Sequence, residues 1–189
     1  DGKSITIEKV ERKDKSERPP KLYDLTTLQR DANRQLGFTA EQTLEYVQSL
    51  YEKKLVTYPR TDSRYVTEDM QDCIPAFVKM WAGLFMPEDV QLPINTWQII
   101  DNSKVSDHHG IITTLGVENY DIHSLPFGER EVLILIALRL ICAVGDSCRY
   151  AETLITAKDN GAIFTAKGKT ILEDGWKAVQ KIYLDTKKE

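Results

Sequence analysis

Residues 153–166, TLITAKDNGAIFTA, hold two β-prone runs separated by the dipeptide Asn160-Gly161. β-Branched and aromatic side chains favour strands, and Asn-Gly between two such runs is a strong short-range sign of a hairpin. At the other end of the chain, residues 4–10, SITIEKV, alternate in polarity like a third strand. The simplest arrangement places both ends of the chain in one small antiparallel sheet.

The sequence between these ends has a helical pattern. One helix is predicted from about Thr26 to Gly37, since glycine commonly ends a helix. Directly afterwards, residues 39–42 form a capping box, in which Thr39 and Gln42 satisfy amides of the first helical turn. The helix that this box opens ends in two lysines, which suit a helix C-terminus, and leads directly into residues 55–58.

Two further helices are predicted in the middle of the chain. Apolar residues recur at helical spacing over residues 70–84, with Thr67 as a candidate cap and Pro75 marking a kink or a late start. Around residues 97–100 we expect a short strand-like piece. The helix of about residues 129–144 is apolar nearly all round, which indicates a core element.

These elements predict an α+β fold. A mainly helical domain of residues 20–147 is inserted into a small antiparallel β domain, which residues 1–19 and 148–189 form together. Residues 11–21 are charged and carry Pro19-Pro20, so we expect a linker or an extended connector there.

The composition is that of a soluble globular protein, with 41% hydrophobic and 29% charged residues. The apolar run of residues 132–138 is far shorter than the roughly 20 residues of a membrane span, so no membrane partner is expected. The 3 cysteines form no CxxC pair, which argues against a zinc site and favours a reducing, cytoplasmic setting. Because the chain starts Asp1-Gly2-Lys3, we expect an excised fragment.

The net charge of −4 is unevenly distributed along the chain. Residues 65–130 hold 3 Lys and Arg against 10 Asp and Glu, whereas residues 1–64 hold 13 against 11 and residues 131–189 hold 9 against 8. Sequence-independent binding of DNA normally comes from clustered Lys and Arg. No strong polybasic cluster is present, so this chain either binds DNA weakly or leaves most of the binding surface to other residues.

The octapeptide TYPRTDSR, residues 57–64, places a tyrosine hydroxyl beside a guanidinium. A residue before proline is held out of the helical region, and in extended backbone Tyr58, Arg60 and Asp62 would point the same way. An arginine at that spacing can favour a phenolate and stabilise charge on an attacked phosphate, which predicts a phosphodiester-attacking tyrosine. The competing interpretation is an ordinary Tyr-Pro turn.

A second group of residues is Ser106-Asp107-His108-His109-Gly110. Histidine is well suited to move a proton or to donate to a phosphate oxygen near neutral pH. A metal site is the competing chemistry, but adjacent histidines do not share a face and no third ligand has suitable spacing. A solvated surface loop is the plainer interpretation of this pair taken alone.

Several segments occur together in one order: LYDLTTLQR at residues 22–30, residues 40–54, TYPRTDSR at 57–64, DHHGIITT at 107–114, LPFGERE at 125–131, FTAKG at 164–168 and GWKAV at 175–179. In that order they resemble the type IA DNA topoisomerases, and within that family the bacterial topoisomerase III branch. The resemblance covers about residues 20–183. It implies single-stranded DNA as the partner and a bacterial, nucleoid-associated location.

The resemblance also implies roles for particular residues. Tyr58 would be the nucleophile that cleaves one strand and keeps its 5′ phosphate as a phosphotyrosine, Arg60 would hold the scissile phosphate, and His108 would contact that phosphate or assist proton movement. Asp62 would orient Arg60, and Thr57 would support the tyrosine. Further candidate DNA contacts are Arg64, Lys21 and Gln29.

The family's metal site is an acidic cluster with an Asp-x-Asp core in a separate Toprim domain, and this chain contains no Asp-x-Asp. We therefore expect Mg²⁺ to be bound by a Toprim domain of the same full-length protein, and this chain alone to be inactive. Two departures from the family pattern stand near the histidines, Gly110 where alanine is expected and Thr113 where proline is expected. They leave the path of that loop open.

Two alternatives remain beside this hypothesis. A tyrosine recombinase also forms a phosphotyrosine, but its arginines and histidine precede a late tyrosine, whereas Tyr58 precedes His108 here. The other alternative is a non-catalytic module that binds single-stranded DNA or another protein.

Overall fold

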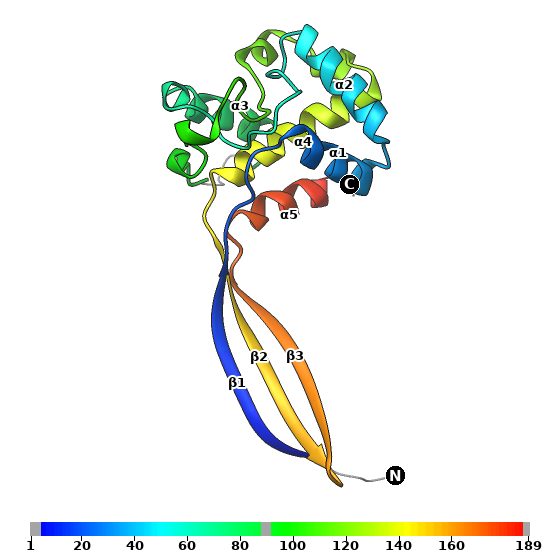
Figure 1. The fold of residues 1–189 in the computed structure, drawn as a ribbon, viewed down its shortest axis with the longest axis vertical. Coiled ribbons are helices and arrows are strands. Elements are labelled where there is room, and N and C mark those ends of the chain that lie inside the picture. Colours follow the sequence, from blue (N-terminus) through cyan, green and yellow to red (C-terminus); the bar gives the residue numbers. More distant parts are fainter. Residues whose placement is uncertain (1–4, 88–91, 187–189) are drawn as a thin grey trace.

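A helical body sits at one end of a long three-stranded ribbon in the computed structural model, which describes residues 5–87 and 92–186 (Figure 1). The ribbon consists of β1 (Thr6–Glu17), β2 (Cys148–Asp159) and β3 (Ala162–Glu173), antiparallel and in the order β1-β2-β3. Residues 6–17 and 148–173 therefore share one sheet, and most of the helical residues are inserted between them, as the sequence predicted. The predicted α+β class is confirmed.

The hairpin between β2 and β3 turns through two residues. Asn160 and Gly161 both have positive φ, 47° and 85°, as the tight turn between twisted strands requires. The prediction of a connector over residues 11–21 is wrong for residues 11–17, because β1 continues to Glu17 opposite Cys148. Charged residues fit this strand because the ribbon is open to solvent, and cross-strand ion pairs such as Lys15 to Glu152 at 2.6 Å form on its face.

The first two helices begin and end where their capping residues predict. In α1 (Leu25–Leu36) the Asp24 carboxylate accepts from the Thr27 amide, and Gly37 closes the helix at φ 75°. In α2 (Ala40–Glu52) the Thr39 and Gln42 side chains form the reciprocal capping box. These caps set the direction in which α2 delivers the chain to residues 53–58.

Helix α3 (Ile74–Phe85) begins late, with Pro75 in its first turn, where the missing amide costs nothing. Thr67 precedes only a short 3-10 turn, Glu68–Met70, and makes no capping bond there. The strand-like piece expected around residues 97–100 is wrong. Thr96–Gln98 is a 3-10 turn, and Ile100 pairs with Val66 through a single bridge.

Helix α4 (Phe127–Ala143) is the core of the body, as its apolar sequence predicted. It packs against α1, α2, α3 and α5, and most of its side chains are buried. Gly128 allows the close approach of α2, because a Cβ there would lie 2.4 Å from the Tyr46 ring. At the same contact, Lys53 pairs with Glu129 at 2.5 Å. This contact holds the end of α2 firmly.

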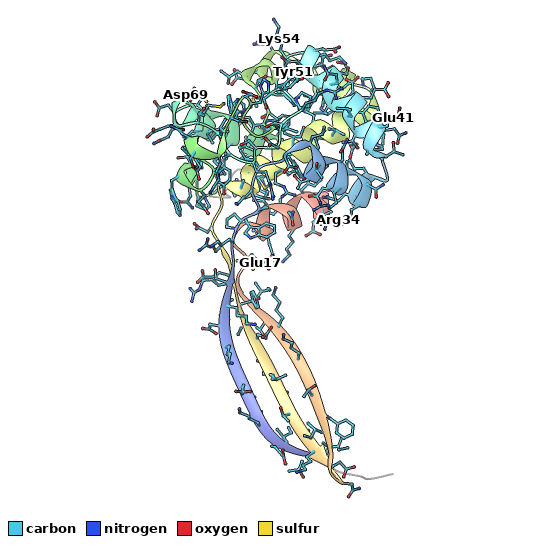
Figure 2. All side chains as sticks on the ribbon, in the orientation of Figure 1. Glu17, Arg34, Glu41, Tyr51, Lys54 and Asp69 are labelled. Carbon is cyan, nitrogen blue, oxygen red and sulfur yellow. The ribbon has the colours of Figure 1, made fainter. Side chains whose placement is uncertain are left out.

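Helix α5 (Lys177–Thr186) returns from the ribbon and packs on α4 (Figure 1). Glu17, at the top of β1, accepts from the Lys177 ammonium and marks the junction between ribbon and body (Figure 2). The last part of residues 148–189 thus lies against the helical body. None of the helices in the described residues is long and apolar enough to cross a membrane.

Candidate active site

The Tyr58 segment leaves α2 through a sharp turn and enters a short pairing with the histidine segment. Lys54 makes this turn at φ 61°. Leu55 accepts from the Thr114 amide at 3.0 Å, and Val56 pairs with Thr113 in an antiparallel bridge. Both Leu55 and Val56 are buried. The tyrosine therefore follows directly from packed backbone, which is a rigid mounting for a reactive group.

Two threonines on either side of Tyr58 join its segment to the histidine loop. The Thr57 hydroxyl donates to the Gly110 carbonyl at 3.2 Å and accepts from the Ile112 amide at 3.0 Å. The Thr61 hydroxyl donates to the carbonyl of His108 at 2.9 Å. The two segments are 47–55 residues apart in sequence but form one hydrogen-bonded unit.

The Tyr58 ring lies between two other rings. The His108 ring centroid is 4.4 Å away at an interplanar angle of 44°, and the Tyr51 ring of α2 is 5.3 Å away, edge-on. Tyr58 is half-buried and His108 is exposed, so a ligand in solvent can reach both rings. His109 turns elsewhere, with Nδ1 2.9 Å from the Gly110 carbonyl oxygen. The structure thus brings Tyr58 and His108 together and separates the two histidines.

Tyr51 and Thr61 are the two residues of this site that the sequence analysis did not identify. Tyr51 lies in α2, is 39% exposed and contacts Tyr58. Its position on the last turn of α2, close before the tyrosine segment, was the only signal in the sequence. Thr61 is buried, and nothing in the octapeptide distinguished it from Thr57.

Arg60 and Asp62 are both exposed. In the described part of the chain, neither forms a hydrogen bond or an ion pair, so Asp62 does not hold Arg60 in this form. The orientation of Arg60 by Asp62 that we expected is absent here, and both side chains are exposed to solvent. Arg60 is free to turn toward an incoming anion.

The three further candidate DNA contacts occupy different places. The Arg64 guanidinium donates to the Leu22 carbonyl at 3.1 Å and lies 4.0 Å from Asp24. Gln29 donates to the Ala40 carbonyl at 2.9 Å and thereby links α1 to α2. Arg64 and Gln29 are engaged in holding the fold, whereas the exposed Lys21 has its ammonium over the Tyr65 ring, 4.7 Å from the centroid.

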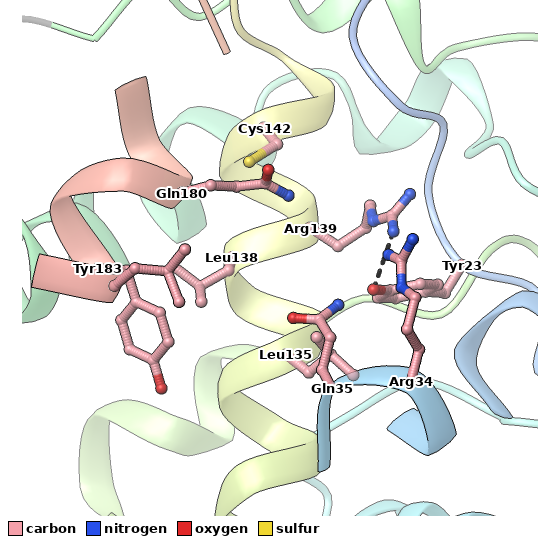
Figure 3. A pocket seen from close by; sticks show the side chains of 10 residues that line it. Tyr23, Arg34, Gln35, Leu135, Leu138, Arg139, Cys142, Gln180 and Tyr183 are labelled. Atoms are coloured by element: carbon pink, nitrogen blue, oxygen red, sulfur yellow. Dashed lines mark hydrogen bonds between the residues drawn. The ribbon is translucent and has the colours of Figure 1, made fainter. Parts of the chain in front are cut away.

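A buried polar network lies beneath the histidine loop. Arg139 of α4 pairs with Asp31 of α1 and donates to the Tyr23 hydroxyl at 2.9 Å, beside a pocket between α1, α4 and α5 (Figure 3). Burial raises the pKa of the Tyr23 phenol well above its usual range. The Tyr23 carbonyl accepts from the Ile111 amide at 2.8 Å, so the network anchors the backbone that carries His108.

The two departures from the family pattern both fit this backbone. The Thr113 hydroxyl accepts from the buried indole of Trp81 at 2.8 Å, so it satisfies a donor that would otherwise have no partner. Gly110 lies against Leu22, and an added Cβ would stand 3.2 Å from the Leu22 Cβ. An alanine there would need a shift of a few tenths of an ångström.

The described residues contain no group of three or more His, Cys, Asp or Glu side chains that could hold a metal ion. What the arrangement offers is a phenol, an imidazole beside it and an exposed guanidinium two residues further on.

The comparisons with known proteins show the family of this chain. The chain belongs to the DNA topoisomerases: the family model with that description matches residues 1–189, and the family is the type IA class. The chain is 39% identical over 185 residues to DNA topoisomerase 3 of Bacillus cereus, and 39% identical over 187 residues to that of Bacillus subtilis. These alignments cover 95% and 94% of this chain but only 25% of each relative, so the chain spans about a quarter of their length.

A solved structure has the same fold. The full-length topoisomerase I from Thermotoga maritima superposes with a TM-score of 0.68 over 94% of this chain and 29% of that one. The sequence identity is 22%, so this likeness concerns the fold alone.

Proposed function

We propose that this chain carries the nucleophile of a type IA DNA topoisomerase that cleaves and rejoins one DNA strand. The Tyr58 oxygen attacks a backbone phosphorus, the bond from phosphorus to the 3′ oxygen breaks, and the leaving 3′ hydroxyl takes up a proton. The 5′ phosphate stays on Tyr58 as a phosphotyrosine. Attack by the 3′ hydroxyl reverses these steps and restores the strand.

The observation that carries this proposal is the Tyr58–His108 ring contact at 4.4 Å, on two segments joined through Thr57 and Thr61. In the proposal, the imidazole beside the phenol moves the proton between Tyr58, the leaving oxygen and solvent, after a ring rotation that brings one of its nitrogens to the oxygen. Arg60, exposed and without an acid partner among the described residues, would hold a nonbridging phosphate oxygen. Charge that develops on the phosphate is thereby stabilised.

The proposal includes a Mg²⁺ ion whose protein ligands lie in another part of the full-length protein. A Toprim domain of the longer protein would bind it, in keeping with relatives about four times as long as the alignment. No step assigned to Tyr58, Arg60 or His108 depends on a metal ligand from residues 1–189. We expect the 189-residue chain on its own not to cleave DNA at a useful rate.

The test is complementation. The chain is mixed with a separately made Toprim-containing piece, Mg²⁺ and a single-stranded oligonucleotide, and adducts that survive denaturant are separated on a gel. Because the 5′ phosphate stays on the protein, an oligonucleotide labelled at its 3′ end should label the adduct, and one labelled at its 5′ end should not.

Two pairs of variants make this test specific. Tyr58→Phe should abolish the adduct, while Tyr51→Phe, which changes the neighbouring tyrosine, should retain it. His108→Ala should slow adduct formation by about 10²-fold or more, whereas His109→Ala should change it little. An adduct that persists in Tyr58→Phe would refute the assignment. Salt-sensitive DNA binding without any adduct would favour the non-catalytic alternative.

A further inference from the structure

A second pocket lies where the chain passes between ribbon and body. This neck pocket, of about 520 Å³, is lined by the residues that follow β1 and by the end of α4, with side chains from three loops between them. Its chemically distinctive members are Arg18, Lys21, Tyr65, Trp97 and Lys104. No acidic side chain is among the described residues that line it. Figure 1 shows where the chain enters the body after β1 and where it leaves the end of α4 for the ribbon.

Two lysine ammonium groups lie against an aromatic ring in the neck pocket. The Tyr65 ring has the Lys21 ammonium 4.7 Å and the Lys104 ammonium 4.8 Å from its centroid. The Lys21 ammonium lowers the pKa of the Tyr65 phenol, and Lys104 adds to this effect. Trp97 is 74% exposed, an unusual state for so large an apolar ring unless something covers it.

The positive charge of the neck pocket is only partly neutralised. Lys104 pairs with Asp101 at 2.9 Å. Arg18 and Lys21 form no ion pair with any of the residues that the structure describes. Two uncompensated cations beside an exposed indole match a ligand that carries both phosphates and flat bases.

We propose that the neck pocket binds single-stranded DNA, with one base stacked on Trp97 and the adjoining phosphates held by Arg18 and Lys21. Stacking on aromatic side chains and a cationic track for the backbone are the two features that bind single strands without regard to sequence. The choice of DNA as the ligand rests on the proposed function. The site is separate from Tyr58, since none of the residues that line it contacts the reactive ring.

The neck pocket is nevertheless attached to the framework of the tyrosine. Tyr65 lies seven residues after Tyr58, so the backbone between them spans at most about 25 Å. The Ser63 hydroxyl donates to the Lys104 carbonyl at 2.8 Å, and the Gly110 amide donates to the Tyr65 carbonyl at 2.7 Å. A strand held in the neck pocket would therefore be fixed relative to both Tyr58 and His108.

Binding of a labelled oligo(dT) measured by fluorescence anisotropy tests this inference. All proteins carry Tyr58→Phe, so the result does not depend on cleavage or on the identity of the nucleophile. Trp97→Ala should weaken binding about tenfold, within the range known for loss of one stacked base, and Trp97→Phe should restore most of it. Lys21→Ala should reduce the slope of log K against log salt by about 0.7.

Matched controls lie elsewhere on the body. Phe127 is an exposed ring with the Arg130 guanidinium 6.0 Å from its centroid, but it is outside the neck pocket, and Phe127→Leu should leave binding unchanged. Lys79→Ala serves the same purpose for charge. Equal affinities of Trp97→Ala and Phe127→Leu would overturn the inference. So would tighter binding of duplex than of single strands, because a paired base cannot stack on Trp97. Loss of the Tyr58 adduct with normal binding here would count against the proposed function alone.

Discussion

Replacing Thr57 with valine removes one hydroxyl and keeps the shape of the side chain. That hydroxyl is the hydrogen-bond partner of the Ile112 amide, and Ile112 is fully buried. The Gly110 carbonyl also loses a donor, but the ring nitrogen of His109 still lies 2.9 Å from it. The main cost is therefore one buried amide without a partner, about 1–3 kcal/mol of unfolding free energy.

Thermal unfolding followed by circular dichroism measures this cost. In a domain of this size, 1 kcal/mol lowers Tm by about 2–4 °C, so Thr57→Val should lower it by about 2–12 °C. Thr26→Val, at an exposed position of α1, is the control and should change the free energy by less than about 0.5 kcal/mol. Equal Tm values for the two variants would refute the argument that this hydroxyl joins the tyrosine segment to the histidine loop.

Three further predictions concern the support of the site. Arg139→Met leaves the buried Asp31 with the Tyr23 hydroxyl, 2.9 Å away, and the largely exposed Arg34, 3.0 Å away. It should cost about 3 kcal/mol in a urea titration, with a smaller loss for Arg139→Lys. Burial raises the pKa of the Tyr23 phenol, so as pH rises the unfolded chain loses the phenol proton before the folded protein does. The free energy of unfolding should therefore fall as pH rises above about 10, and it should fall less steeply in Tyr23→Phe. Equal slopes of this free energy against pH in the two proteins would contradict the argument. Gly116→Ala places a Cβ 2.4 Å from the Lys54 carbonyl oxygen and should lower the free energy of unfolding. The Cβ of Gly83→Ala in α3 meets nothing within 4 Å, so this variant should raise the free energy of unfolding by about 0.5–1 kcal/mol. Changes of the same sign in both variants would contradict this prediction.

Most of the secondary structure could be predicted because local chemistry sets it. The Thr39 capping box, Gly37 and Asn160-Gly161 act on their immediate neighbours, and each ends or begins an element where expected. The errors fall where local signals are weak. Residues 11–17 are highly charged for a strand, and they are strand because β2 supplies partners and solvent reaches both faces.

The candidate site was predictable in part. The chemistry of their side chains singled out Tyr58, Arg60 and His108 in the sequence. The structure places the Tyr58 and His108 rings together. The catalytic roles of all three residues stay predictions. Asp62 was expected to hold Arg60 because residues two apart in extended backbone share a face, but both side chains point into solvent without pairing in the described residues. Spacing alone does not create an ion pair between exposed groups, since solvation competes with it.

The sequence by itself indicated the family through several segments in one order. It also determined the boundaries of the first two helices, the hairpin and the residue types that can attack or hold a phosphate, because each of these features depends on a few adjacent residues. Only the tertiary structure decided that Thr57 and Thr61 reach the histidine loop, that Tyr51 contacts Tyr58, and that Trp97 lines one pocket with Lys21 and Arg18 at the neck. Except for Tyr51 and Tyr58, these residues lie tens of residues apart in the sequence, and their segments meet in a body whose core is the buried helix α4. No pattern within any one segment carries that information.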